Sequence, residues 1–528
     1  MSVINRGDGP TDISPAEGLA VPEKGLVREL AQVPTSVSVA ESQGAREVTI
    51  RQVGPLVLVL TGATFLNTLS VQAVVILLPQ ITKELSIPQT RQQWIISAFA
   101  LTSGSFLLLC GKLADVYGRK LLFIFGCFWI TATALGTAFS PIEGAALTIP
   151  TAMGILGHTI PPGRVKNYSF AFYSGGAPMG QILGNLLGGV ISQFTSWKVV
   201  FFVFAGASFV IGITAFFVIP RESSRRDDAE ARAAGVDWIG AFLYTSGTLL
   251  LLTGLSEGVS QGWKTPFIIA LLVLSVIFLV AFITWQLHLE RRGTSDPLMR
   301  VSIFSNGRFS VAMIIVCLFS AGFTNWLVYS TYFYQNYQLL SPIQTTLRFL
   351  PLGIFGIIAV ASSGYLLSRV PGNWILIIGL SSGAISNLLF AAPIPPTTSY
   401  FAYGLISMSL GAVGADTVYP CLGLFTTQSL PRKDQSLAGA MFQTTAALGR
   451  TMFLPITAAI QYSVQNREKD RGKAENSAYL SGLRSAEWFC FALMVVSLGL
   501  VIFGLKNIGK IGMLKRLGTV QSSRKPQE

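Results

Sequence analysis

The sequence has few charged residues and few residues that bind metals. Only 12% of its 528 residues are charged, whereas 51% are hydrophobic, and the mean hydropathy is +0.56. Soluble domains carry about 25% charged residues, so this composition excludes an ordinary soluble protein and predicts one that resides in a lipid bilayer. With only two histidines in the chain, we expect no metal site.

The sequence also lacks a disulfide framework and a phosphate-binding loop, which excludes further classes of function. The five cysteines are odd in number and fall within apolar stretches, which excludes a disulfide framework. The chain also lacks a Gly-x-x-x-x-Gly-Lys-Ser/Thr phosphate loop, which disfavours an ATP-driven pump. We therefore expect transport driven by a gradient, with no cofactor and no enzymatic reaction.

Long apolar runs recur from Gly54 to Leu505. Runs of 18 or more residues are long enough to cross a ~30 Å hydrocarbon core as helices. They predict an all-α polytopic membrane protein with about fourteen transmembrane helices. The predicted spans are residues 54–78, 93–113, 121–139, 142–160, 168–192, 198–219, 237–257, 265–285, 309–334, 345–368, 373–391, 399–427, 435–460 and 487–506.

The polar segments predict how the spans are grouped. A faint repeat between the segments beginning at Gly111 and Gly364 indicates two six-helix bundles with an inserted helix pair between them. The predicted parts are a disordered cytoplasmic tail (1–50), a first bundle (51–220), a linker and the inserted pair (221–308), a second bundle (309–508) and a cytoplasmic tail (509–528).

The net charge of +13 follows from topology. Most Lys and Arg residues fall on the side of the two termini, as expected for cytoplasmic loops. We therefore predict a multi-pass protein of the cell membrane whose basic residues do not bind nucleic acid. The exception is Gln465–Arg484, a charged segment predicted to be an outer loop.

A charged turn interrupts two apolar spans at residues 111–120. Its glycines allow tight backbone approach, its carboxylate can cap a helix or pair with a cation, and its basic residues favour the cytoplasmic side. We predict a clamp beside a gate, the alternative being a positive anchor alone. The residues concerned are Gly111, Asp115, Gly118, Arg119 and Lys120.

The fifth span is rich in glycine. Small residues four positions apart let helices approach closely, and a proline permits a bend. The pattern predicts a hinge or close helix packing, two roles that need not exclude each other. It is formed by Gly176, Pro178, Gly180, Gly184, Gly188 and Gly189.

Two ionisable residues, Asp416 and Arg450, are predicted deep within spans. Burying each costs about 2.5–3.5 kcal/mol on insertion scales, so both are candidates for a functional role. One alternative is a structural ion pair between neighbouring helices, and the other is substrate binding or proton coupling. Arg348 and Glu487 are predicted at span ends, where no such role is expected.

Neutral polar and aromatic side chains form a second candidate set. Placed together, they would line a mostly apolar site with a few hydrogen-bonding groups, as is usual for small molecules. Hydrogen bonding between helices is the alternative for any one of them. The set comprises Asn67, Gln72, Gln181, Asn185 and Gln443, with Trp326, Tyr329 and Tyr332 nearby.

With these motifs the sequence resembles the major facilitator superfamily, most closely its fourteen-helix drug:proton antiporter family of fungi. The resemblance spans about residues 50–510. The turn at 111–120 matches the signature between helices 2 and 3, which in that family helps control the opening of the cytoplasmic side. The glycines of the fifth span resemble the family's antiporter motif. The resemblance implies a monomeric carrier that exports drugs, toxins or secondary metabolites in exchange for protons.

The sequence departs from this family at two points. Asn67 stands where the first helix usually bears an acidic residue, and the arginine-glutamine-glycine stretch that usually begins the fourth helix is absent. Residues 139–143 also leave almost no loop before that helix. These departures leave open uptake or facilitated diffusion of a small nutrient or ion, a divergent inactive copy, or a segment missing from the gene model.

Overall fold

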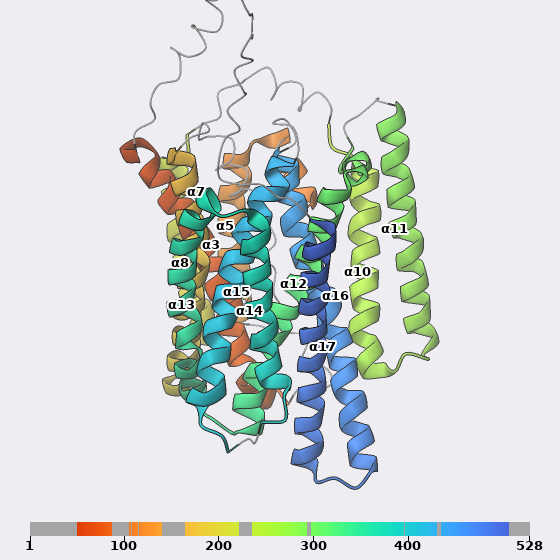
Figure 1. Ribbon diagram of the computed structural model, residues 1–528. Helices are drawn as coiled ribbons and strands as arrows, with labels where there is room; N and C mark the ends of the chain where they lie inside the picture. Colours follow the sequence, from red (N-terminus) through yellow and green to blue (C-terminus); the bar gives the residue numbers. More distant parts are fainter. Residues whose placement is uncertain are drawn as a thin grey trace, which may run out of the picture. The chain divides into compact units, whose positions relative to one another are not determined.

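The computed structural model describes residues 50–86, 105–106, 108–114, 116–139, 164–220, 235–292, 297–394, 397–429 and 435–505. These residues are helical, with no strand among them (Figure 1). The long helices are α3 (Ile50–Glu84), α5 (Arg119–Phe139), α7 (Arg164–Phe194), α8 (Lys198–Val218), α10 (Trp238–Gln261), α11 (Pro266–Arg292), α12 (Gly307–Tyr332), α13 (Pro342–Arg369), α14 (Gly372–Ala391), α15 (Tyr400–Gln428), α16 (Gln435–Asp470) and α17 (Glu475–Gly504). A 3₁₀ turn, η2 (Val301–Ser305), precedes α12, and a π-helical turn, η3 (Phe333–Tyr337), follows it.

The predicted all-α membrane fold is confirmed. Ten helices of the described segments are long and apolar enough to cross a membrane. Of the fourteen predicted spans, the one at 142–160 lies outside the described residues, and the one at 93–113 is described only in part. The division into two bundles, an inserted pair and two tails stays a prediction.

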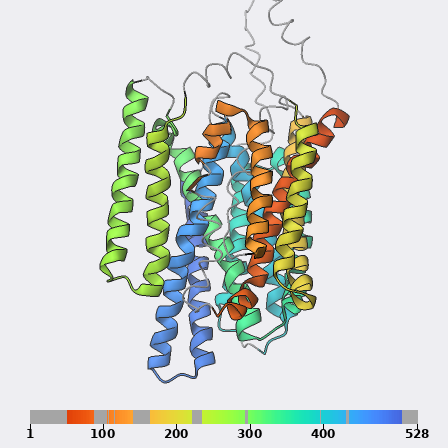
Figure 2. The ribbon, with the colours of Figure 1, turned by 180° about the vertical axis from the view of Figure 1, so that it is seen from behind.

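The N-terminal helices pack through backbone contact. Helix α3 packs against α7 and α8, and α5 packs against α8 (Figure 2). A Cβ placed on Gly180 or Gly184 of α7 would lie 2.5 Å from the carbonyl oxygen of Phe65 or Leu69 of α3. Only glycine allows this approach, so the α7 glycines fix the α3–α7 distance.

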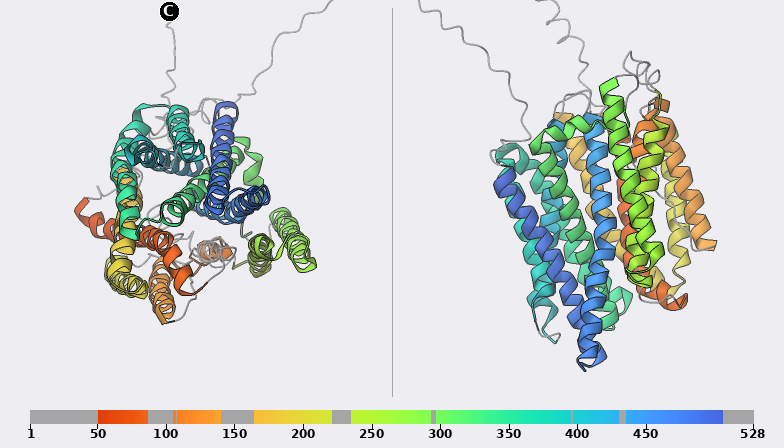
Figure 3. Two further views of the ribbon diagram at one scale, coloured as in Figure 1. Left: turned by 90° about the horizontal axis from the view of Figure 1, so that it is seen from below. Right: turned by 90° about the vertical axis from the view of Figure 1, so that its right-hand side faces the viewer.

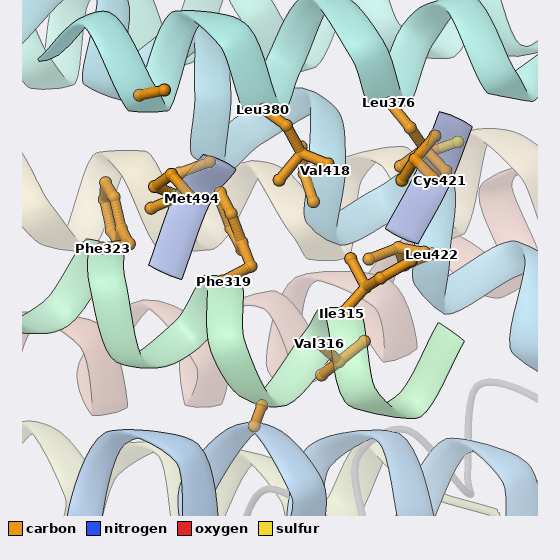
Figure 4. Packing of buried hydrophobic residues seen from close by; sticks show 14 of the residues in the cluster. Ile315, Val316, Phe319, Phe323, Leu376, Leu380, Val418, Cys421, Leu422 and Met494 are labelled. Atoms are coloured by element: carbon orange, nitrogen blue, oxygen red, sulfur yellow. The ribbon is translucent and has the colours of Figure 1, made fainter. Parts of the chain in front are cut away.

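The later helices surround α12. It packs against α14, α15, α16 and α17. Its side chains Phe319 and Phe323 lie beside Met494 of α17, and Ile315 lies beside Leu422 of α15 (Figure 4). Because apolar side chains cover α12 on several sides, any ionisable group at this centre is held away from water and from lipid headgroups.

The pair α10–α11 lies at the edge of the bundle in Figures 1 and 3, with α10 against α16. Asp237 caps α10: its Oδ1 accepts hydrogen bonds from the Gly240 N–H (2.8 Å) and Trp285 Nε1 (3.0 Å). Its Oδ2 accepts one from Gln286 Nε2 (2.7 Å), and Gln286 Oε1 accepts one from the Met299 N–H (3.2 Å). One carboxylate thereby joins both helices of the pair to the segment that leads into α12.

The end of α16 and the start of α17 correct the sequence analysis. The predicted outer loop at 465–484 is wrong, because α16 continues to Asp470 and α17 begins at Glu475. The two helices extend beyond the ends of their neighbours (Figures 1 and 2). The charged residues of this segment predict a loop. Helices that project past the hydrocarbon core, however, carry charged side chains without a desolvation cost.

A Schellman motif ends α16. The Gly472 N–H donates to Lys469 O (2.9 Å) and the Lys473 N–H to Glu468 O (3.1 Å), with Gly472 at φ +82°. The Glu468 carboxylate accepts hydrogen bonds from Arg471 Nη1 (2.8 Å) and from Lys473 Nζ. Charge pairing therefore stabilises the tight turn where the sequence indicated a loop.

Candidate functional site

The charged turn leads into α5 and contacts α8. Gly118 adopts φ +100°, a left-handed conformation that favours glycine, and α5 begins at the next residue. Lys120 Nζ donates hydrogen bonds to Phe216 O (2.8 Å) and to Ile219 O, and lies 5.5 Å from the centroid of the Phe216 ring. Its positive charge sits at the C-terminus of α8, where the helix dipole favours a cation.

The other residues of this turn are placed only in part. Gly111 faces Ala440 of α16, since a Cβ on Gly111 would lie 3.6 Å from the Ala440 Cβ, and Arg119 is the first residue of α5. Asp115, the predicted partner of a cation, lies outside the described residues. The clamp itself therefore stays a prediction, and what the structure gives is the attachment of α5 to the end of α8.

Asp416 and Arg450 lie on the neighbouring helices α15 and α16. Within the described part of the chain, no hydrogen bond or salt bridge joins them, and Arg450 Nε is buried without a hydrogen-bond partner. The Tyr419 hydroxyl lies within electrostatic range of both charges and donates to Ser320 Oγ of α12 (3.0 Å). The structural ion pair is thus not formed in this conformation, and a tyrosine lies near both charges instead.

The polar residues of α3 and α7 meet at the helix interface. Gln72 and Asn185 are 3% and 2% exposed, and their Nε2 and Oδ1 atoms have no hydrogen-bond partner among the described residues. Thr346 of α13 donates to Asn185 O (2.8 Å), which links α7 to the second half of the chain. Buried hydrogen-bonding groups without a protein partner near this helix crossing could bind a polar ligand or water.

The remaining members of this set, Asn67, Gln181 and Gln443, are half-buried on α3, α7 and α16. Pro178 belongs to α7, but its side chain lies outside the described residues, and Gly189 faces Thr346 of α13. The structure therefore places Gln72 beside Gly184, the residue before Asn185, but does not gather all the predicted polar residues at one point.

The aromatic residues of α12 lie where several helices meet. Trp326 is fully buried, and the rings of Tyr329 and Tyr332 pack edge to face at 5.7 Å. These two tyrosines belong to a cluster with residues of α3, α16 and α17, including Val75, Leu454 and Ala486. The predicted aromatic set is consequently part of the contact between the first and second halves of the chain.

Two residues of interest were missed by sequence reasoning. Tyr419 follows Asp416 by three positions, which places it on the same helix face, and this spacing was a usable signal. Glu487 was predicted at a span end, but it lies well inside α17 and is only 3% exposed. The error follows from ending the outer loop too late, because the helix begins at Glu475.

A model described as "Major Facilitator Superfamily" matches residues 60–454. A low affinity ammonium transporter of Saccharomyces cerevisiae is 28% identical over 392 residues, 71% of this chain and 74% of the relative. Efflux pump terJ of Aspergillus terreus is 27% identical over 405 residues, 74% of this chain and 77% of the relative.

The fold is also similar to that of a solved transporter. The crystal structure of the human organic anion transporter MFSD10 (TETRAN) superposes with a TM-score of 0.57 at 15% sequence identity. The match covers 86% of this chain and 100% of that one. At this identity the likeness concerns the fold alone.

Proposed function

The chain belongs to the Major Facilitator Superfamily, and we propose that it exports small organic molecules across the plasma membrane in exchange for protons. It is a multi-pass membrane transporter and not an enzyme. Its similarity to an efflux pump supports export, and its similarity to an ammonium transporter supports the alternative of uptake. The proposal takes the protein to act as a monomer.

The observation that carries the proposal is the unpaired state of Asp416 and Arg450 around Tyr419. A carboxylate inside a helix bundle without a cation partner is costly, so Asp416 is most stable when protonated. In the proposed cycle Asp416 takes up a proton from the outer side and releases it to the cytoplasm. Arg450 and Tyr419 then stabilise the carboxylate while the substrate exchanges.

The proposed gate lies on the cytoplasmic side. Lys120 joins the start of α5 to the end of α8, so these two helices move as one body. The α7 glycines allow α3 and α7 to remain in backbone contact, while Gly111 faces α16 of the second half. We propose that the cytoplasmic side opens where the signature turn meets α16, as alternating access requires.

The test uses inside-out vesicles, in which export becomes accumulation in the lumen. Vesicles with an acidic lumen are given a mixture of small organic compounds, and the retained compounds are identified by mass spectrometry. Parent vesicles should concentrate some compounds, and a protonophore should abolish this. Asp416→Asn should reduce accumulation to the level of empty vesicles, whereas the exposed Glu475→Gln, which removes the same charge, should not. Equal accumulation by Asp416→Asn and the parent would refute the proposed role of Asp416.

A second function, uptake of a small cation, rests on the relative that transports ammonium and on Asn67 in place of an acidic residue. Labelled methylammonium is a suitable probe in whole cells. Uptake that persists after a protonophore collapses the gradient would favour this function over export.

A further inference from the structure

Glu487 is a buried carboxyl group that the proposed function does not use. It lies on α17 about 18 Å along the axis from Glu475, at 1.5 Å per residue. Its side chain is 3% exposed, and neither carboxyl oxygen has a hydrogen-bond partner among the described residues. Such a group inside a membrane protein is expensive to retain and is therefore a functional candidate.

Contacts on either side fix the level of Glu487. Toward the C-terminus of α17, Phe489 stacks with Phe453 of α16, with the ring centroids 6.3 Å apart. Toward the N-terminus of α17, Gly482 packs on the backbone of Gln461, also of α16. Between these contacts α16 presents Thr457, whose hydroxyl accepts a hydrogen bond from Asn325 Nδ2 of α12 (2.9 Å). Glu487 thus lies at the level of the Asn325–Thr457 pair.

Three hydrogen-bond acceptors at this level lack a partner among the described residues. Besides the two Glu487 oxygens, Asn325 Oδ1 is buried without a partner among the described residues. Buried acceptors of this kind require a donor or a cation. A proton on Glu487 turns one of these oxygens into a hydrogen-bond donor and removes the buried charge.

The groups that titrate around Glu487 do not supply a counter-charge. Arg484, one turn earlier on α17, donates to Ile394 O (2.6 Å) and lies beside Tyr337. Arg450 of α16 lies within range of Tyr419, and α14, which also packs on α17, carries no ionisable residue. The other ionisable groups of this region are a thiol and phenols, which are ordinarily neutral at physiological pH: Cys490, Tyr329, Tyr332, Tyr462 and Tyr479.

We propose that Glu487 is a second proton-binding site, in which the carboxyl group binds and releases a proton at the junction of α12, α16 and α17. The inference rests on the proposed proton exchange and adds a site to it. Because Tyr329 of the same region belongs to a cluster with Val75 of α3, Glu487 lies beside the contact between the two halves. Movement of the halves would expose the carboxyl to water and release its proton.

The test measures the proton directly and needs no substrate. Infrared difference spectra of the purified full-length protein between acid and alkaline pH report the C=O stretch of protonated carboxyl groups. We expect a titrating band that is lost in Glu487→Gln and retained in Asp416→Asn and Glu475→Gln. If Glu487→Gln does not fold, Glu487→Asp replaces it, and the band should shift in frequency.

The outcomes separate this site from the proposed function. If the band that is retained in Asp416→Asn also survives in Glu487→Gln, or is unshifted in Glu487→Asp, the proposal is overturned. A titration midpoint that moves when sodium replaces choline would also overturn it, in favour of a sodium site. A band that behaves as expected, in a protein whose export does not depend on the proton gradient, would support the Glu487 site while the proposed antiport fails.

Discussion

Replacing Gly184 by alanine tests whether backbone contact between α3 and α7 stabilises the protein. The new Cβ would lie 2.5 Å from Leu69 O and 3.0 Å from the Leu69 Cα, whereas ordinary contact begins at 3.4 Å. The helices must separate by about 0.9 Å, because the obstructing atoms are backbone and have no rotamer to change. Overpacking of this kind costs about 1–3 kcal/mol.

Gly206→Ala on α8 is the matched control, because a Cβ there meets no atom within 4 Å. Both changes gain up to about 1 kcal/mol of helix propensity, so the difference between the two variants isolates the packing term. We expect Gly184→Ala to be about 1–3 kcal/mol less stable than Gly206→Ala in reversible unfolding by sodium dodecyl sulfate, followed by tryptophan fluorescence. Equal stabilities would show that α3 and α7 separate freely and that the glycines do not fix their distance.

Two further predictions concern the ends of helices. Lys120→Met should leave the last carbonyls of α8 without a hydrogen-bond donor, which should speed hydrogen exchange near Phe216 and slow export. Lys120→Arg should keep both the slow exchange and the export rate. Unchanged hydrogen exchange in Lys120→Met would contradict the capping role. The hydrogen bond from Lys473, aided by Arg471, lowers the pKa of Glu468 below its ordinary 4.5. The paired carboxylate therefore stabilises the α16–α17 turn at neutral pH, and this stabilisation is lost as pH falls through the lowered pKa. Hydrogen-exchange protection of the turn should decrease in the parent as the pH drops below the ordinary Glu pKa of 4.5, and should be low at every pH in Glu468→Gln.

Much of the fold was predictable because hydrophobic run length is a direct signal in membrane proteins. Helices α8 and α14 begin and end within a residue or two of the predicted spans 198–219 and 373–391. Both are short and closely match the thickness of the hydrocarbon core, so hydropathy alone marks their ends. The glycine spacing of α7 likewise predicted close packing with a neighbour, although the identity of that neighbour, α3, came only from the structure.

The candidate site was predictable only as a list of residues. Ionisable residues deep within a span, such as Asp416 and Arg450, can be recognised from the sequence alone. Their insertion into the membrane costs free energy whichever way the side chain points. Whether they pair depends on the relative rotation of α15 and α16, which neither helix encodes alone. The structure leaves them unpaired and brings Tyr419 near both, a three-body arrangement that no single-helix pattern specifies.

Glu487 shows why hydropathy alone fails to mark the N-terminal end of α17. Hydropathy assigns a charged segment to a loop. It therefore predicts that this helix begins at the first long apolar run, which places Glu487 at the membrane–water interface. The signal against a loop was Gly472, the usual residue at the C′ position of a helix, preceded by ten residues without proline or glycine. Had Gly472 been taken as the end of one helix, Glu475 would begin the next, and Glu487 would fall a full three turns inside it. A carboxyl at that depth, only 3% exposed, belongs with Asp416 among the groups that we propose bind a proton in the transport cycle.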